Sequence, residues 1–170
     1  VVQLLPIPRE EAITSLLAVS EFNDDTDLLM LTQGGFIKRT RLSAFSNIRS
    51  NGLIAIGLED GDALTWVRLS IPGDSVLIGS KAGMTIHFRL ADGELRPLGR
   101  TARGVRSMNL RKGDSLVSMD VLPAELADQI AASADDAGDG DDAGDVAETA
   151  VAAEGPWVLV ASASGLGKRV

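Results

Sequence analysis

The 170-residue sequence contains no cysteine, no tyrosine and a single histidine, His87. The missing cysteines exclude disulfides, thiolate metal sites and cysteine nucleophiles, which is typical of an intracellular protein. One histidine cannot build a histidine metal cluster, and a chain without tyrosine cannot supply a tyrosine nucleophile. No apolar run approaches the roughly 20 residues of a membrane-spanning helix, and no charged-then-apolar leader opens the sequence, so no membrane partner is expected. The abrupt start on VVQLLPIP and the end on GKRV favour a piece of a longer chain.

Basic residues are missing from one long stretch. From Asp120 to Glu154 the sequence holds 11 acids and no base, whereas the remainder holds 16 bases and 13 acids, a net charge of +3. Within it, residues 123–155 consist mostly of Ala, Asp, Gly and Glu, so this segment is predicted to be a disordered acidic insertion, with a short helical turn near 124–132. Two interpretations stay open for it: a passive surface insertion, or an acidic arm that mimics DNA or regulates binding.

Three short apolar segments, each interrupted by a glycine turn, repeat along the chain. They read LLMLTQGGFIKRT, SVLIGSKAGMTIHF and WVLVASASGLGKRV, and their turn glycines align as Gly35, Gly83 and Gly165. The second interval between these glycines is much longer than the first, and the acidic insertion at 123–155 accounts for the difference. The underlying period is therefore about 50 residues, which is in the range of repeat architectures.

A second repeated element lies between these hairpins. NGLIAIGLEDGDALTWVRL aligns with RGVRSMNLRKGDSLVSMDV, which matches Asp62 with Asp114. Four short antiparallel strands in about 50 residues are typical of a propeller blade. The sequence therefore predicts an all-β fold, a partial array of blades. Their predicted ranges are 1–20 for the end of one blade, 21–70 and 71–122 for two blades, and 156–170 for the start of another.

The glycine-rich turns do not have the pattern of a nucleotide-binding loop. A Walker loop needs G-x-x-x-x-G-K-[ST], but SASGLGKRV has Ser162 at the first glycine position and Arg169 after Lys168. The Gly-Asp pairs recur once per blade and are interpreted as turn formers. His87 aligns with Arg39 and is expected at the surface. The acids from Glu21 to Asp27 are expected to form a solvated face.

Lys and Arg recur at matching positions of the repeat, so an array would gather them along one rim. Such a rim suits the phosphate backbone of DNA, bound through counterion release without base readout. Few exposed aromatics are expected for stacking on single strands, which favours duplex DNA. The alternative is that these cations are ordinary solubilising charges. The candidate cations are Lys38, Arg39, Arg41, Arg49, Arg89, Arg96, Arg100, Arg103, Arg106, Lys168 and Arg169.

The repeats [TS]-x-x-G-x-x-K-R-T and G-x-x-x-[IM]-x-L-x-x-G-D-x-[LV] resemble the C-terminal domain of the DNA gyrase A protein, a type IIA topoisomerase. The resemblance covers nearly everything outside 120–155. It implies a β-pinwheel, a propeller variant with exchanged strands, that wraps duplex DNA around a basic outer rim and so supports ATP-dependent negative supercoiling. The family's K-R-T motif falls on Lys38, Arg39 and Thr40, with a weaker copy at Lys168 and Arg169, and implies DNA contacts there.

The sequence departs from the family pattern in two places. The second unit reads Ile86, His87 and Phe88 where the K-R-T motif would stand. The family's Q-R-R-G-G-x-G box is absent, and SNIRSNG and GRTARGV are degenerate equivalents in the corresponding loops.

The resemblance also implies that this chain is not an enzyme by itself, since the catalytic tyrosine and the metal site of the topoisomerase lie elsewhere. No cofactor is expected in this chain.

The implied partners are duplex DNA, the rest of gyrase A and the gyrase B protein, in a cytoplasmic, nucleoid-associated setting. A propeller-type protein-interaction scaffold and the related topoisomerase IV A-subunit domain are the alternatives. DNA binding should fall steeply with salt and weaken on Lys38→Ala or Arg103→Ala.

Overall fold

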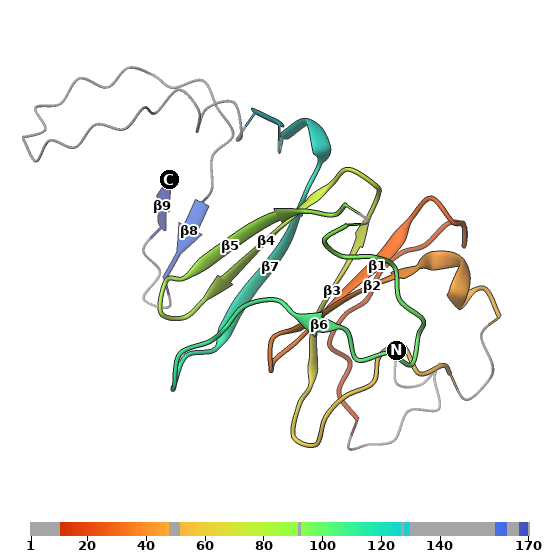
Figure 1. The fold of residues 1–170 in the computed structure, drawn as a ribbon, viewed down its shortest axis with the longest axis horizontal. Coiled ribbons are helices and arrows are strands. Elements are labelled where there is room, and N and C mark those ends of the chain that lie inside the picture. The colour runs from red at the N-terminus through yellow and green to blue at the C-terminus, as the bar shows by residue number, and fades with distance from the viewer. Residues whose placement is uncertain are drawn as a thin grey trace, which may run out of the picture. The chain divides into compact units, whose positions relative to one another are not determined.

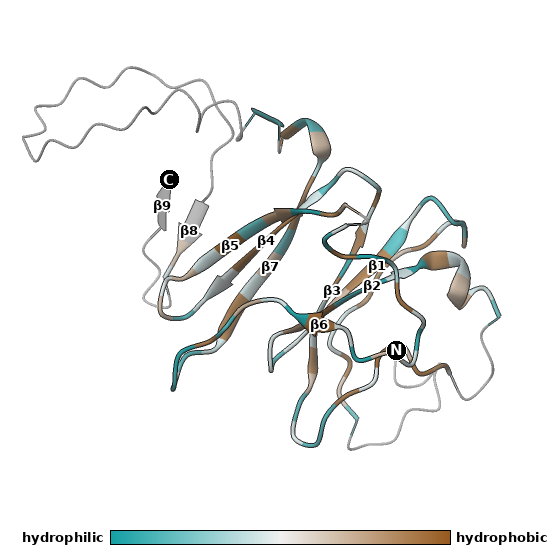
Figure 2. Ribbon diagram, in the orientation of Figure 1, coloured by the Kyte–Doolittle hydropathy of each residue, from teal (hydrophilic) through white to brown (hydrophobic). Residues whose placement is uncertain are grey.

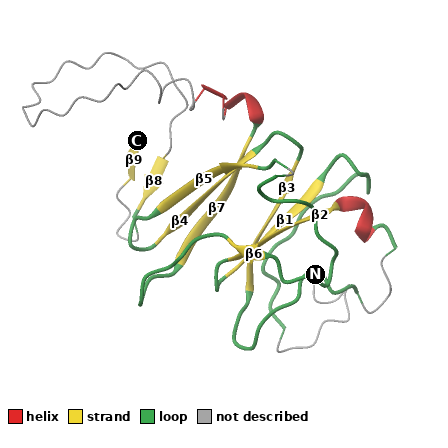
Figure 3. Ribbon diagram, in the orientation of Figure 1, coloured by secondary structure: helices red, strands yellow, loops and turns green. Residues whose placement is uncertain are grey.

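The computed structural model describes residues 11–47, 52–91, 93–126, 128–129, 159–162 and 167–169. Antiparallel strands make up nearly all of the regular structure in these ranges (Figure 3), so the predicted all-β fold is confirmed. The chain forms two compact units, residues 1–122 and 123–170. None of the described helices is long and apolar enough to cross a membrane.

The first sheet has four strands in the order β3-β1-β2-β6 (Figure 1). They are β1 (Asp27–Thr32), β2 (Phe36–Arg41), β3 (Leu64–Ser70) and β6 (Val105–Arg106). Strands β1 and β2 form a hairpin, in which Gly35 has a φ of 86° and its N–H donates to the Thr32 carbonyl at 3.0 Å. A short 3-10 helix, η1 (Leu42–Phe45), follows β2.

The second sheet has three strands in the order β5-β4-β7: β4 (Ser75–Ser80), β5 (Thr85–Arg89) and β7 (Leu116–Leu122). Its register reproduces that of the first sheet. Leu29 lies opposite Arg39 and Arg68, and its repeat equivalent Leu77 lies opposite His87 and Asp120. Each sheet also has a register shift at the equivalent place, after Leu31 and after Gly79. Residues that are equivalent in the sequence repeat therefore have equivalent partners in the two sheets.

Strand β6 belongs to the second repeat but pairs with β2 of the first repeat (Figure 1). The two strands approach closely just before β6, where Gly104 has a φ of 101° and any Cβ would collide with the Ile37 carbonyl. Only glycine fits this position without strain. The exchanged strand that the resemblance implies is present in the first sheet.

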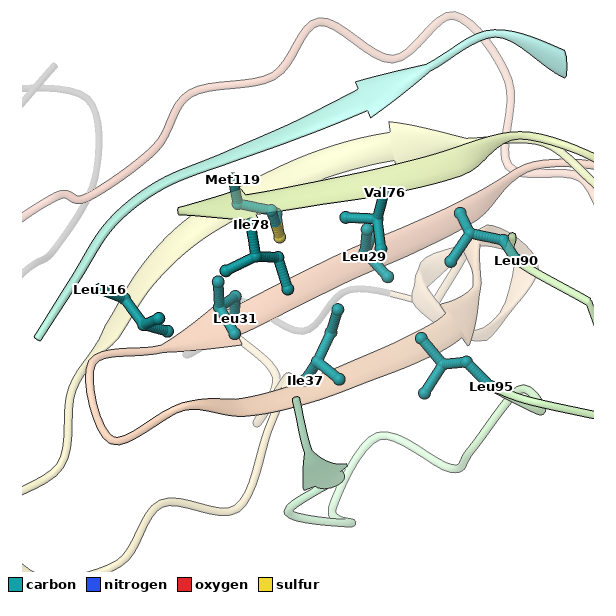
Figure 4. Packing of buried hydrophobic residues seen from close by; sticks show 9 residues of the cluster. All are labelled: Leu29, Leu31, Ile37, Val76, Ile78, Leu90, Leu95, Leu116 and Met119. Atoms are coloured by element: carbon teal, nitrogen blue, oxygen red, sulfur yellow. The ribbon is translucent and has the colours of Figure 1, made fainter. Parts of the chain in front are cut away.

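Side chains from both sheets share one hydrophobic core. Leu29, Leu31 and Ile37 of the first sheet meet Val76 and Ile78 of the second (Figure 4). Because side chains alternate along a strand, Met30 points to the opposite face of the first sheet, where a second cluster forms. Figure 2 shows hydrophobic residues concentrated along the strands and hydrophilic residues at the loop tips.

The unit formed by residues 123–170 contains a third hairpin, β8 (Leu159–Ala161) paired with β9 (Gly167–Arg169). Residues 124–126 and 128–129 are helical, as predicted for the start of the acidic segment. The predicted disorder of the remaining insertion concerns residues outside the described ranges. The predicted blade end at 1–20 has no strand within residues 11–20.

Candidate nucleic-acid interface

The K-R-T motif lies inside the first sheet. Strand β2 is flanked by β1 and β6, and the exposed fractions of Lys38, Arg39 and Thr40 are 0%, 1% and 1%. Side chains so deeply buried cannot touch a polyanion at the surface. The sequence-based assignment of these three residues to a DNA-contacting surface is therefore revised. Lys38 is covered in part by the loop before the exchanged strand, whose Gly99 and Arg100 carbonyls face its ammonium and which comes from another part of the sequence.

Lys38 holds two loops against β2. Its ammonium lies 2.5 Å from the Ala55 carbonyl, 2.5 Å from the Arg100 carbonyl and 3.3 Å from the Gly99 carbonyl. Burial, with a smaller contribution from the nearby Arg100 charge, lowers the pKa of Lys38 from 10.5 to about 8. These contacts give Lys38 a structural role, in which its ammonium donates to partly buried carbonyls of two loops.

Arg39 forms a buried ion pair with Asp27, at 3.1 Å between Nε and Oδ2. It also donates through Nη1 to the Leu90 carbonyl at 2.8 Å, in the connection that leaves β5. Asp27 has an exposed fraction of 0%, so the expectation of a solvated acidic face is wrong for this residue. Asp27 is the first residue of β1, and its side chain is a core ion-pair partner.

The second repeat replaces this ion pair with a serine–histidine pair at the same positions. Ser75 and His87 are the repeat equivalents of Asp27 and Arg39, and His87 Nε2 lies 2.8 Å from Ser75 Oγ. His87 is exposed, as the sequence predicts. A hydrogen bond between the two positions is therefore retained, although the aspartate and the arginine are not.

Arg41 is half-exposed, with 37% of its side chain accessible. Its guanidinium donates to the Asp24 carbonyl at 2.8 Å and lies 3.6 Å from Asp27 Oδ1. These contacts anchor Arg41 to the loop before β1. It can still present part of its charge to solvent.

The Gly-Asp pairs act in turns, as predicted from their recurrence. Asp62 Oδ1 accepts from the N–H groups of Gly34 and Ala63, and Asp114 Oδ1 accepts from those of Ala82 and Ser115, at 2.7–2.9 Å. Each aspartate thus ties its own turn to the neighbouring hairpin tip. A hydrogen bond from Ser80, more than the two backbone bonds, lowers the pKa of the Asp114 carboxyl below its usual value.

Two exposed arginines lie over one aromatic ring at the exchanged strand. Arg106 is directly opposite Phe36 in the β2–β6 pairing, and its Cζ lies 5.0 Å from the ring centroid. Arg103 reaches the same ring, with its Cζ at 4.3 Å. Phe36 itself is buried, with an exposed fraction of 8%. The ring provides a fixed platform that holds both guanidinium groups by cation–π attraction while leaving them accessible.

An acidic side chain joins this cluster from the loop before β3. Glu59 forms an ion pair and a hydrogen bond with Arg103 Nη1, and both side chains are about half accessible, at 55% and 46%. The two loops also meet through a 3.2 Å hydrogen bond from the Gly57 N–H to the Ala102 carbonyl. We call Phe36, Glu59, Arg103 and Arg106 the arginine cluster.

The remaining candidate cations lie apart from this cluster or outside the described residues. Arg100 is half-buried and Arg89 is exposed at the end of β5. Lys168 and Arg169 are in β9, of which only the backbone is described, and Arg49 lies outside the described ranges. The structure thus brings together Arg103 and Arg106. No group of His, Asp or Glu side chains suited to a metal ion occurs in the described part of the chain.

Sequence reasoning missed Phe36 and Glu59. Phe36 follows the turn glycine and has the pattern of an ordinary strand residue, and only the exchanged strand brings Arg103 and Arg106 to it. Glu59 had a weak signal, because GLEDGD in the first repeat stands where the second repeat has NLRKGD. That second turn exposes Arg111 and Lys112, two further cations.

Comparison with known proteins identifies relatives over the whole chain. The family model described as "DNA gyrase C-terminal domain, beta-propeller" matches residues 26–70 and 74–123. The DNA gyrase A protein of Synechocystis sp. is 55% identical over 172 residues, which is 100% of this chain and 20% of that protein. The chloroplastic/mitochondrial DNA gyrase A protein of Arabidopsis thaliana is 40% identical over 169 residues, 99% of this chain and 16% of that protein. The chain therefore spans a fifth or less of the length of these two relatives.

Two solved structures share the fold. A structure of the DNA gyrase A C-terminal domain superposes with a TM-score of 0.69 at 24% identity, covering 98% of this chain and 45% of that one. The C-terminal domain of DNA topoisomerase IV superposes with a TM-score of 0.65 at 27% identity, covering 74% of this chain and 38% of that one. Both are longer than the sequence described above.

Proposed function

The chain belongs to the DNA gyrase C-terminal domain family, and from this premise we propose that it binds and wraps duplex DNA. The DNA would lie along basic side chains at the surface and be bent around the blades. In the whole enzyme this wrapping would support ATP-dependent negative supercoiling. The partners would be duplex DNA, the rest of gyrase A and the gyrase B protein, in the bacterial cytoplasm with the nucleoid.

The arginine cluster is the observation that carries this proposal. Arg103 and Arg106 are accessible, and their guanidinium groups lie 4.3 and 5.0 Å from the centre of the Phe36 ring. Guanidinium groups bind phosphate oxygens through charge-assisted hydrogen bonds. Holding the side chains in place before binding reduces the conformational entropy that they lose on contact with the backbone. Arg41, Arg89 and Arg100 would add phosphate contacts.

The proposed contacts go to phosphates and carry no base recognition. The cluster residues lie on strands β2 and β6 and in the loops beside them, and none of them lies on a helix that could enter a major groove. Binding to a backbone alone gives affinity that depends on salt and hardly on sequence. This suits a domain that wraps whichever segment the enzyme holds.

DNA cleavage would be carried out elsewhere in the enzyme, because the chain contains no tyrosine to act as the nucleophile. No cofactor is proposed for this chain. A topoisomerase IV A-subunit domain is the related candidate, but the 55% identity to a gyrase A protein over the full chain favours gyrase. A protein-interaction scaffold is the candidate from a different class.

The proposal is tested with the full-length protein on a relaxed closed-circular plasmid. After incubation without ATP, the plasmid is relaxed by a separate type I topoisomerase and the topoisomers are resolved. Wrapping with one handedness predicts a shift of the linking-number distribution that grows with protein concentration. Two linear duplexes of unrelated sequence should bind with affinities within about two-fold of each other and should lose affinity together as salt rises.

An unchanged topoisomer distribution, together with no salt-dependent duplex binding, would contradict the proposal. A protein scaffold predicts that result. Strong binding of one duplex over the other would contradict the backbone-only mode.

A further inference from the structure

Glu59 is paired with the guanidinium of Arg103, one of the two groups that the proposed function assigns to DNA phosphates. Arg103 pairs with the Glu59 carboxylate while its guanidinium lies over Phe36. Beside the pair is a surface hollow of about 320 Å³ whose lining includes Phe36, Glu59 and Arg106. A phosphate oxygen that approaches Arg106 from this hollow would therefore also come close to the Glu59 carboxylate.

The fold does not require an acid at position 59. The equivalent position in the second repeat is Arg111, and the neighbouring Asp60 corresponds to Lys112. The turn is held by Asp62, as its counterpart is held by Asp114. Since the second repeat makes the same turn with two cations, turn formation does not explain the negative charge of Glu59.

A DNA phosphate can readily displace the Glu59 carboxylate from Arg103. An ion pair between half-accessible side chains contributes little to stability, since water competes for both charges. Duplex DNA brings a line of phosphates whose potential adds to the attraction for each single guanidinium. Once displaced, the carboxylate would stay near the phosphates and repel them, which weakens the complex and lowers its salt dependence.

We propose that Glu59 is an intramolecular competitor of the DNA phosphate at Arg103. The carboxylate keeps the guanidinium paired and positioned over Phe36 until DNA arrives, and its negative charge limits the affinity of this site. This inference rests on the proposed function, because the competing anion is the phosphate of bound duplex DNA. A wrapped segment would thereby be released more readily than from an uncompensated arginine pair.

The test compares Glu59→Gln with Asp60→Asn in the full-length protein. Each variant removes one negative charge from adjacent positions, but only Glu59 is paired with Arg103. Affinity for a linear duplex is measured across a salt series, and melting temperatures establish that the variants remain folded. Glu59→Gln should tighten binding about three- to ten-fold at low salt and steepen the slope of log K against log salt by about 0.9. Asp60→Asn should give a clearly smaller gain.

An Arg103→Ala background tests whether the effect of Glu59 depends on its pairing with Arg103. In an Arg103→Ala background, Glu59→Gln and Asp60→Asn should give equal gains. Equal gains from both charge removals in the wild-type background would overturn the proposal in favour of a general charge effect. Weaker binding by Glu59→Gln would overturn it as well, since Glu59 would then orient Arg103 for DNA. Failure of the proposed function is distinguishable, because the unmodified protein would then show no salt-dependent duplex binding.

Discussion

The ammonium of Lys38 lies where the carbonyl oxygens of Ala55, Gly99 and Arg100 converge. The folded state holds its pKa at about 8, whereas the unfolded chain has a value near 10.5. Below pH 8 both states bind the proton. Between pH 8 and 10.5 the unfolded state binds more protons than the folded state, so the contribution of Lys38 to stability rises with pH.

Replacement of Lys38 by Met should therefore have a pH-dependent effect. At pH 7 the variant should lose about 1–3 kcal/mol of unfolding free energy, because it removes the hydrogen bonds that the ammonium donates to the carbonyls of Ala55, Gly99 and Arg100. At pH 9.5 the difference from the wild type should be larger. Urea unfolding at both pH values measures this, and a difference that is equal at the two values would contradict the assigned environment.

Arg39 and Asp27 form a buried ion pair, and the second repeat has His87 and Ser75 at the equivalent positions. Arg39→Met should cost about 3–5 kcal/mol, because it leaves the Asp27 carboxylate buried without its main counter-charge. The double variant Asp27→Ser with Arg39→His installs the pair found at Ser75 and His87 and should be less destabilised than Arg39→Met alone. Chemical denaturation of both variants measures the coupling. A double variant less stable than Arg39→Met would contradict the equivalence of the two sites.

Residue types alone could not reveal that the K-R-T motif is buried. Two bases after a glycine turn have the same pattern whether they face solvent or a neighbouring loop. The distinction depends on residues 99–106, the loop before β6 and β6 itself, which belong to the next repeat and follow the whole of the second hairpin in the sequence. The error at Asp27 has a related origin, because the aspartates at 24, 25 and 27 resemble a solvated loop although the third begins β1.

At the scale of elements, β6 links the first two repeats. It pairs with β2 through two residues only, and further bonds from Ser107 to the Gly35 carbonyl extend the contact. The same strand carries Arg106, and Arg103 lies in the loop just before it. The pairing of β6 with β2 is therefore also what places Arg103 and Arg106 over Phe36.

Gly104→Ala should disrupt this feature. The new Cβ would collide with the Ile37 carbonyl, and the φ of 101° is unfavourable for any residue with a side chain. Hydrogen exchange should show loss of protection at the Ser107 amide, together with weaker DNA binding. Gly93→Ala is the control, because its Cβ would meet no atom within 4 Å. Unchanged protection at Ser107 in the Gly104 variant would contradict the importance of the close approach.

At the scale of the whole molecule, the repeat period was enough to predict the class of fold. The sequence repeat reappears as matching strand registers, matching bulges and matching turn aspartates. The period could not predict which cations reach the surface, because burial depends on how one repeat covers the next. Arg39 is covered by a following repeat, whereas its counterpart His87 is exposed.

The repeats are alike in backbone but differ in charge, and we propose that this difference determines where DNA binds. The first Gly-Asp turn carries Glu59 and Asp60, and the second carries Arg111 and Lys112. The central claim is that phosphates are bound by the exposed arginines on Phe36, while the K-R-T motif holds the blades together.

The salt dependence of duplex binding by two variants of the full-length protein tests this claim most directly. Arg103→Ala with Arg106→Ala should weaken binding and reduce the slope of log K against log salt by about 1.8, or about 0.9 for each lost phosphate contact. Lys38→Met, measured at a temperature where it remains folded, should leave that slope unchanged. A reduced slope for Lys38→Met alongside an unaltered slope for the arginine variant would contradict the account.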